Sequence, residues 1–424
     1  MKLGYDPSEV DYRALTRAAF YTPMGRHSVY RHQIDWGARI LMRGDPGTNK
    51  TSGARALAHS IRDCGWFAFD STVGEAGCGL IPAVDLEAKM IRHYVADFIA
   101  ENFVEGKPGL MLVDDILDFP QSLRPYLLGL ILDKRLGSTW FDPQWRVFGA
   151  LNEADDTAVG IDLATNAANR PCHIVWLGAP MPQWKSYILG LADEFEAVAV
   201  AEDPETLEDA GAIQDRIAAN WQAQFRSSLR IVTGFVGGKG MKMLHNKPGC
   251  DDPQASHAWP SRRTWEFAAR AHASGKLHGL TGNTAAAFIA GYVGGSAYLE
   301  LAEYEEKMDL PDPAHFLDGQ DDKGNAVSFT HQQYRIDRTA ALMDACLPHL
   351  IPKDAPNRRA RAERYFAFML EVGTEALDSV AEVLVGTILK KSPELLGSTV
   401  AQKALAKCNP MLKSIDKAKQ DSRR

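Results

Sequence analysis

The sequence predicts an α/β fold in which helices cover both faces of a parallel β-sheet, followed by regions that are entirely helical. The first observation behind this prediction is that five short apolar segments, typical of buried strands, alternate with helical stretches. These segments are residues 39–42, 66–69, 110–113, 146–151 and 173–177. The second observation is that strand signals stop after about residue 201, whereas helical periodicity continues. Strands that alternate with helices form crossover connections, which favour a parallel sheet.

The apolar spacing also predicts the helices that accompany this sheet. In the first half of the chain they are expected over residues 11–20, 51–62, 85–103 and 122–135. A helix over 204–229 is expected to lead into a long glycine-rich loop over 234–261. The later helices are expected around 263–274, 284–292, 298–307, 332–346, 358–389 and 395–407.

These patterns divide the 424 residues into three expected domains, in line with about 100–200 residues per domain. Residues 1–203 would form the α/β core with an N-terminal extension, where the strand signals lie. Residues 204–315 would form a helical domain, and residues 316–424 a helical C-terminal extension. The second boundary is placed in the turn-rich segment 310–325.

Composition excludes some classes of function. The formal net charge is −7 and the isoelectric point about 6.0, whereas nucleic-acid-binding domains are usually basic, so nucleic acid is not the expected partner. The lysines and arginines of residues 403–424 are interpreted as a solvated helix end. The six cysteines form no CxxC pair, which excludes the usual spacing of a zinc site.

The sequence also predicts where the protein is found. It contains no apolar run long enough to span a bilayer, so no membrane association is expected. The first residues become acidic early and lack the apolar segment of a signal peptide. We therefore expect a cytoplasmic protein with thiols in a reducing compartment.

The sharpest motif follows the first predicted strand. It reads Gly44-Asp45-Pro46-Gly47-Thr48-Asn49-Lys50-Thr51 and leads, through Thr51 and Ser52, into the alanine-rich helix expected over 51–62. A loop of this kind cradles phosphates with its backbone N–H groups, its lysine meets the β- and γ-phosphates, and its threonine hydroxyl binds Mg²⁺. Residues 44–52 are therefore the predicted nucleotide site. Asn49 stands where a glycine is required, but asparagine is one of the few other residues that adopt positive φ.

Two further strands end in polar side chains. The apolar segment 110–113 is followed by Asp114 and Asp115, and segment 146–151 by Asn152. Asp114 would hold the Mg²⁺ together with Thr51, while Asp115 would polarise the attacking water. Asn152 would lie between the sheet and the γ-phosphate. Taken alone, Asp114 and Asp115 could form a helix N-cap, and Asn152 could be an ordinary turn residue.

Taken together, these motifs resemble those of the MoxR-like group of AAA+ ATPases, over roughly residues 34–315. Arg170, in the segment 153–176, matches the arginine that reaches a neighbouring subunit's nucleotide, although Pro171 stands where phenylalanine is usual. Arg263, in Trp259-Pro260-Ser261-Arg262-Arg263, aligns with the sensor 2 arginine of the helical lid, here residues 204–315. The family usually has glutamate at the position of Asp115, whose carboxylate is one methylene nearer the backbone, so slowed hydrolysis is expected.

The resemblance implies a ring-forming remodelling or assembly chaperone that uses ATP and Mg²⁺. It implies a homo-oligomer, expected to be a hexamer, and a protein client or a partner with a von Willebrand factor A domain. Arg170 would act in trans on the transferred phosphoryl group, and Arg263 would couple hydrolysis to motion of the lid.

Two alternatives stay open. Asn49 and Asp115, both departures at catalytic elements, fit a nucleotide-gated assembly module with little turnover. A nucleic-acid motor or loader is less favoured, because only the loop and the basic tail point to it. The segment 234–240 lacks a serine or threonine after its lysine, so it is interpreted as a flexible lid loop rather than a second phosphate loop.

Overall fold

The fold was analysed in a computed structural model of the chain. The structure describes residues 3–70, 81–85, 87, 90–94, 107–136, 139–152, 163–178, 207–239, 241–249, 252–306, 311–320, 324–326, 339, 342–343, 345–372, 388 and 392–408. The chain divides into two compact units, Met1–Gln222 with Lys239–Glu300, and Ala223–Gly238 with Leu301–Arg424. The three expected domains remain a prediction.

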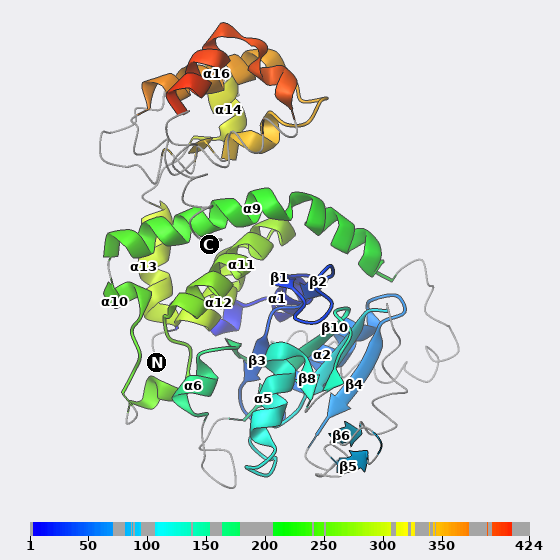
Figure 1. The fold of residues 1–424 in the computed structure, drawn as a ribbon. Coiled ribbons are helices and arrows are strands. Elements are labelled where there is room, and N and C mark those ends of the chain that lie inside the picture. Colours follow the sequence, from blue (N-terminus) through cyan, green and yellow to red (C-terminus); the bar gives the residue numbers. More distant parts are fainter. Residues whose placement is uncertain are drawn as a thin grey trace, which may run out of the picture. The chain divides into compact units, whose positions relative to one another are not determined.

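The first unit is built on a five-stranded parallel sheet (Figure 1). Its strands are β3 (Ile40–Arg43), β4 (Gly65–Phe69), β7 (Gly109–Val113), β10 (Trp145–Leu151) and β11 (Cys172–Val175). They lie in the order β11-β3-β10-β7-β4, and every neighbouring pair is parallel. The predicted α/β class, the parallel sheet and all five predicted strand segments are thereby confirmed.

The inner strands of this sheet are covered on both faces. All five residues of β7 and all seven of β10 are buried, as expected for a parallel sheet with helices on each side. Helix α2 (Lys50–His59) packs against β4 and β7, and α5 (Arg124–Asp133) packs against β10. Helix α12 (Gly282–Val293) packs against β11 at the edge of the sheet.

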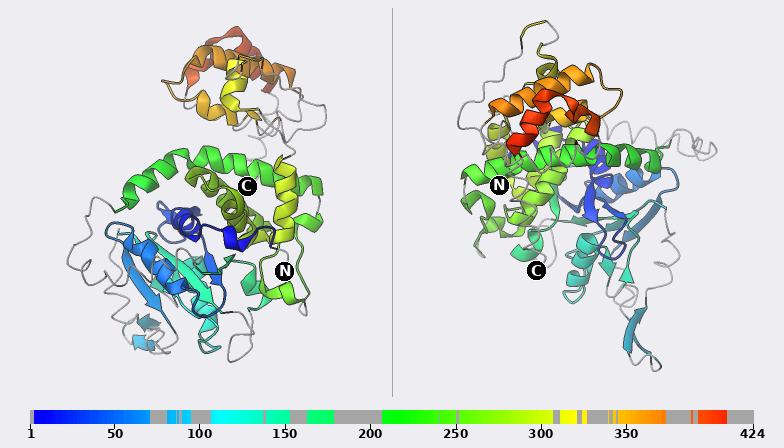
Figure 2. Two further views of the ribbon diagram at one scale, coloured as in Figure 1. Left: turned by 180° about the vertical axis from the view of Figure 1, so that it is seen from behind. Right: turned by 45° about the horizontal axis from the view of Figure 1, so that its top comes forward.

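Within the described residues, three antiparallel hairpins accompany the sheet. They pair β1 (Pro23–Arg26) with β2 (Ile34–Trp36), β5 (Ile81–Asp85) with β6 (Met90–Tyr94), and β8 (Arg135–Leu136) with β9 (Thr139–Trp140). Figures 1 and 2 show β5 and β6 beyond the end of the main sheet. The helix predicted over 85–103 is therefore wrong at 90–94, where a hairpin partner takes up the backbone hydrogen bonds; residues 95–103 lie outside the described residues.

The other helices largely follow the prediction. Helix α1 (Tyr12–Phe20) begins after Asp11, whose carboxylate accepts from the N–H of Ala14 as an N-cap. Helix α11 (Arg262–His278) begins after Ser261 with a capping box. Short helical segments are η1 (Pro7–Glu9), α6 (Thr165–Ala168), α10 (Met241–Leu244) and η6 (Pro253–Ser256).

The loop predicted over 234–261 is wrong in its first part, because α9 runs from Ala210 to Lys239. Each glycine in a helix interior costs about 1 kcal/mol relative to alanine. This cost is offset by burial, since Phe235 is fully buried and lies 5.6 Å from the ring of Tyr304 in α13 (Gly295–Glu306). The segment 234–239 is therefore helical rather than a flexible loop.

The second unit is mostly helical where it is described, as predicted, but the helix expected over 358–389 ends at Glu371, since Val372 has an extended backbone. It contains α14 (Pro313–Asp318), η7 (Leu347–His349), α16 (Arg358–Glu371), η8 (Pro393–Gly397) and a helix over 399–408. Its core includes Phe316, Leu342, Tyr365 and Phe366. No helix in the described part of the chain is both long enough and apolar enough to cross a membrane.

Candidate nucleotide site

The predicted phosphate loop connects β3 to α2 at the carboxyl end of the sheet. The N–H of Gly44 lies 3.4 Å from the carbonyl of Leu151, which joins the start of the loop to β10. Asn49 has φ 63° and ψ 32°, the left-handed conformation. Gly47 also has positive φ, at 79°. The loop thus places asparagine where a left-handed residue is required, and Asn49 is one of the residue types that adopts this conformation at low cost.

Lys50 is buried and fully hydrogen-bonded at this end of the sheet. Its side-chain amine donates to the carbonyls of Gly44 at 2.8 Å and Asp45 at 2.9 Å. The amine also donates to the side-chain oxygen of Asn152 at 2.8 Å. The lysine therefore lies folded over its own loop and reaches the residue predicted to sense the γ-phosphate.

The two residues predicted to hold Mg²⁺ are in direct contact. The hydroxyl of Thr51 lies 2.5 Å from a carboxylate oxygen of Asp114, which follows β7. Oxygen ligands of this kind suit Mg²⁺, which usually takes one or two protein ligands and completes its shell with water and phosphate. Within the described residues, no group of three or more His, Cys, Asp or Glu side chains could hold a metal by itself.

Asp115 adopts an uncommon backbone conformation. Its φ is 47°, a region that aspartate and asparagine enter far more readily than glutamate. Its carboxylate accepts from the side-chain amide of Asn152 at 2.9 Å. Burial raises the pKa of Asp115 above its usual value, and the neighbouring Asp114 and Asp118 raise it further. The left-handed turn gives a physical reason for aspartate at a position where a longer acid was expected.

These contacts join residues from three separate segments at the carboxyl end of the sheet. Asn152 bridges Lys50 and Asp115, and Thr51 contacts Asp114. The chain leaves β3 toward β4 on one side, and leaves β10 toward β11 on the other. Adjacent strands whose connections diverge at their carboxyl ends form the usual ligand crevice of an open α/β sheet.

A cavity of about 970 Å³ opens beside the loop. One wall consists of Thr48, Asn49 and residues of α2, and the opposite wall of residues 8–13 and Thr16. Trp176, directly after β11, lines the same cavity. A volume of this size is ample for a small-molecule ligand.

Sequence reasoning missed the N-terminal wall and Trp176. Residues 8–16 were expected only as part of an extension, and Trp176 as part of a predicted strand. The available signal was the helix at 11–20 with its Asp11 cap, but nothing in its pattern showed that it would lie beside the loop. Such a contact depends on tertiary packing.

The two predicted arginines lie apart from this network. Arg170 is exposed between α6 and β11, and Arg263 is exposed in the first turn of α11. Their neighbours are linked, since the hydroxyl of Ser261 donates to the side-chain oxygen of Asn169 at 2.8 Å. In the described part of the chain, no hydrogen bond or ion pair joins either arginine to residues 44–51. Their roles stay predictions.

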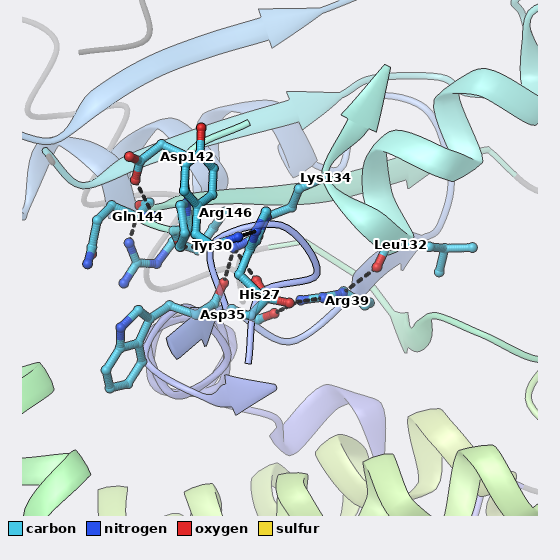
Figure 3. Close-up of polar contacts among 12 residues, drawn as sticks. His27, Tyr30, Asp35, Arg39, Leu132, Lys134, Asp142, Gln144 and Arg146 are labelled. Atoms are coloured by element: carbon cyan, nitrogen blue, oxygen red, sulfur yellow. Dashed lines mark hydrogen bonds and ion pairs between the residues drawn. The ribbon is translucent and has the colours of Figure 1, made fainter. Parts of the chain in front are cut away.

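A second polar cluster, also missed, lies at the amino end of the sheet (Figure 3). Asp35 pairs with Arg39, and the amine of Lys134 lies 2.6 Å from the carboxylate of Asp35. Lys134 also donates to the carbonyls of Trp36 at 2.6 Å and Pro143 at 3.0 Å.

Charge pairing decides the protonation of this cluster. Burial opposes ionisation of Asp35, but Arg39 and Lys134 outweigh it and hold its pKa well below the usual range. Burial lowers the pKa of Lys134 to about 8, against the opposing effect of Asp35. Arg146 lies nearby, with its Nε donating to the carbonyl of Phe20 at 3.0 Å. The cluster therefore joins β2 to the residue before β3 and to the carboxyl end of α5.

The chain was also compared with known proteins. No protein-family model and no curated protein matches it.

Proposed function

We propose that the protein binds and hydrolyses ATP as a MoxR-like AAA+ protein, remodelling or assembling a partner protein as a ring oligomer. The observation that carries the proposal is that five polar residues converge at the carboxyl end of the parallel sheet: Lys50, Thr51, Asp114, Asp115 and Asn152. These residues come from three segments of the chain, and each has the chemical type that phosphoryl transfer needs at its place.

The phosphates would lie in the loop 44–51, against its N–H groups and the amino end of α2. Lys50 would exchange its contacts with the loop carbonyls for the β- and γ-phosphate oxygens. Thr51 and Asp114 would hold Mg²⁺, which would neutralise charge on the phosphates. Asp115 would orient the attacking water, and Asn152 would fix the carboxylate of Asp115.

The cavity beside the loop would take the nucleoside. It shares Thr48, Asn49 and Ser52 with the phosphate loop, so one ligand can occupy both. Its other wall is residues 8–13, which gives the N-terminal segment a direct part in nucleotide binding.

The wider biological role follows from the same resemblance. Arg170 would complete the site of a neighbouring subunit, and Arg263 would act from the lid. Both are exposed, which fits side chains that meet a nucleotide or a second subunit. A protein client or a von Willebrand factor A domain partner, and a cytoplasmic location, belong to this proposal.

One observation favours the alternative, a nucleotide-gated assembly module with little turnover. It is the hydrogen bond that Asp115 accepts from Asn152. The short carboxylate of Asp115 already accepts this bond from the amide of Asn152 at 2.9 Å, which makes that oxygen a weaker acceptor for a proton of the attacking water.

The deciding measurement is ATP turnover of the purified protein with Mg²⁺ over a concentration series, beside Lys50→Ala. A matched control is Lys242→Ala, which removes an exposed lysine. We expect turnover per subunit to rise with concentration and to vanish in Lys50→Ala alone. ATP binding without turnover would favour the gated module. Failure of the unaltered protein to bind ATP would reject both.

A further inference from the structure

Trp176 makes a direct hydrogen bond to the phosphate loop. Its indole N–H donates to the carbonyl of Thr48 at 2.9 Å. The backbone N–H of Trp176 donates to Arg43, the last residue of β3, at 2.6 Å. The side chain is only 6% exposed, so its position is fixed by packing. The residue that follows the edge strand β11 thus contacts the second half of the loop at Thr48.

Three glycines leave room for Trp176 and its neighbours to lie this close to the loop. A side chain at Gly44 would collide with the carbonyl oxygen of Trp176, and one at Gly53 would come within 2.9 Å of its ring. Gly178, with φ 85°, would place a side chain 3.1 Å from the carbonyl of Thr48. The loop, the first turn of α2 and the segment after β11 therefore pack closely together around Trp176.

Tyr12 supports the indole from the other side. The two rings lie 4.5 Å apart between centroids. The tyrosine hydroxyl lies 2.9 Å from the carbonyl oxygens of both Pro7 and Val175, to one of which it donates, and it accepts from the N–H of Leu177 at 3.3 Å. Helix α1 thereby holds the residues on both sides of Trp176 in place.

We propose that Trp176 is a positioning residue for nucleotide binding: its indole N–H holds the Thr48 carbonyl so that the loop keeps its phosphate-binding shape before ligand arrives. The role in binding rests on the proposed ATPase function, whereas the ordering of the loop does not. Asn49 makes such support useful, because a left-handed asparagine is less favourable than glycine, and an external bond to the preceding carbonyl stabilises that conformation.

The experiment compares Trp176→Phe with the unaltered full-length protein. Phenylalanine keeps an aromatic ring but removes the indole N–H. A matched control is Trp265→Phe, because the indole of Trp265 is 3% exposed and donates to the carbonyl of Met243 at 2.6 Å, in a different part of the first unit. The readouts are hydrogen exchange of the amides of residues 44–51 without nucleotide, the Kd for ATP, the kcat at saturating ATP, and the quenching of tryptophan fluorescence by ATP.

We expect faster exchange over residues 44–51 in Trp176→Phe alone, and a Kd for ATP about tenfold higher, the effect of losing one buried hydrogen bond. The kcat at saturation should stay within about twofold, because bound phosphates restore the loop. The fluorescence change on binding ATP should shrink only in this variant.

Three results would overturn the inference. Unchanged loop exchange in Trp176→Phe would show that the indole does not order the loop. An unchanged Kd for ATP in this variant would show that such ordering has no part in nucleotide affinity. Equal changes in loop exchange and in Kd in Trp265→Phe would show that both arise from general destabilisation of the protein. If the unaltered protein binds no ATP while Trp176→Phe still loosens the loop, the proposed function fails and the loop contact stands.

Discussion

The two ends of the parallel sheet each hold a buried lysine, and they hold it differently. At the amino end, the Lys134 amine lies 2.6 Å from the Asp35 carboxylate and donates to two backbone carbonyls. At the carboxyl end, the amine of Lys50 donates to three neutral oxygens, and the amide of Asn152 stands between it and Asp115.

Among the contacts of Lys50 are three to neutral oxygens, whereas Lys134 lies directly against a carboxylate. A direct buried carboxylate fixes a lysine, because breaking the pair leaves a charge stranded in a low dielectric. Carbonyl and amide oxygens are weaker partners for an ammonium, so phosphate oxygens can replace them. Left-handed residues other than glycine lie at both ends, Asn49 and Asp115 at the carboxyl end and Lys134 at the amino end, so backbone strain does not distinguish the two lysines.

The largest effect is expected from Lys134→Met, which tests whether the lysine at the amino end has a structural role. It leaves Asp35 paired with Arg39 alone, so we expect the free energy of unfolding to fall by about 3 kcal/mol, as for other broken buried pairs. Denaturant unfolding measures this, and Lys242→Met serves as the exposed control, with an expected change below about 0.5 kcal/mol. A loss of ATP affinity without loss of stability would contradict the structural role.

A smaller effect is expected from Asp115→Asn, which alters the carboxyl end only. Asparagine keeps the left-handed turn and an oxygen that can accept from Asn152, while the negative charge is lost. We expect ATP turnover to fall about 100-fold, the usual contribution of a group that handles a proton, with little change in Kd. Single-turnover kinetics and equilibrium binding separate the two; unchanged turnover would exclude Asp115 from the chemistry.

The smallest effect is expected from Asn49→Gly. Because φ is already 63°, glycine removes the small strain of asparagine, and we expect the Kd for ATP to change by less than about threefold. Asn49→Val, which cannot adopt positive φ readily, should weaken ATP binding far more. Equal affinities for all three, measured by titration, would mean that the conformation at residue 49 does not control the site.

Most of the sheet could be predicted from the sequence, because buried parallel strands are continuous apolar runs that need no knowledge of their partners. The same holds for the loop, Asp114 and Asn152, which stand directly after such runs. The predicted helix over 85–103 failed because Met90–Tyr94 is stabilised as a strand by pairing with Ile81–Asp85, a contact that helical spacing does not reveal.

The rest of the site depends on contacts between distant residues. The pairing of Asp35 with Lys134 joins residues far apart in the chain, and neither lies in a motif. Trp176 is one apolar residue among several at the end of a strand, and only the fold shows that it reaches Thr48. The sequence therefore predicts the type of chemistry, while packing determines which side chains support it.

The close fit around Trp176 also has a consequence for how the chain can evolve. Gly44 belongs to a recognisable motif, but Gly53 and Gly178 do not, although side chains at these positions would also meet the indole or the loop. Gly53 alone of the three faces the indole ring, so it is expected to change together with Trp176. Side chains at Gly44 and Gly178 would meet backbone atoms, the carbonyl oxygens of Trp176 and Thr48, so both positions stay restricted to glycine whichever residue stands at 176. A lineage that replaced the tryptophan with a smaller residue would therefore free Gly53 to vary while the other two glycines stayed fixed.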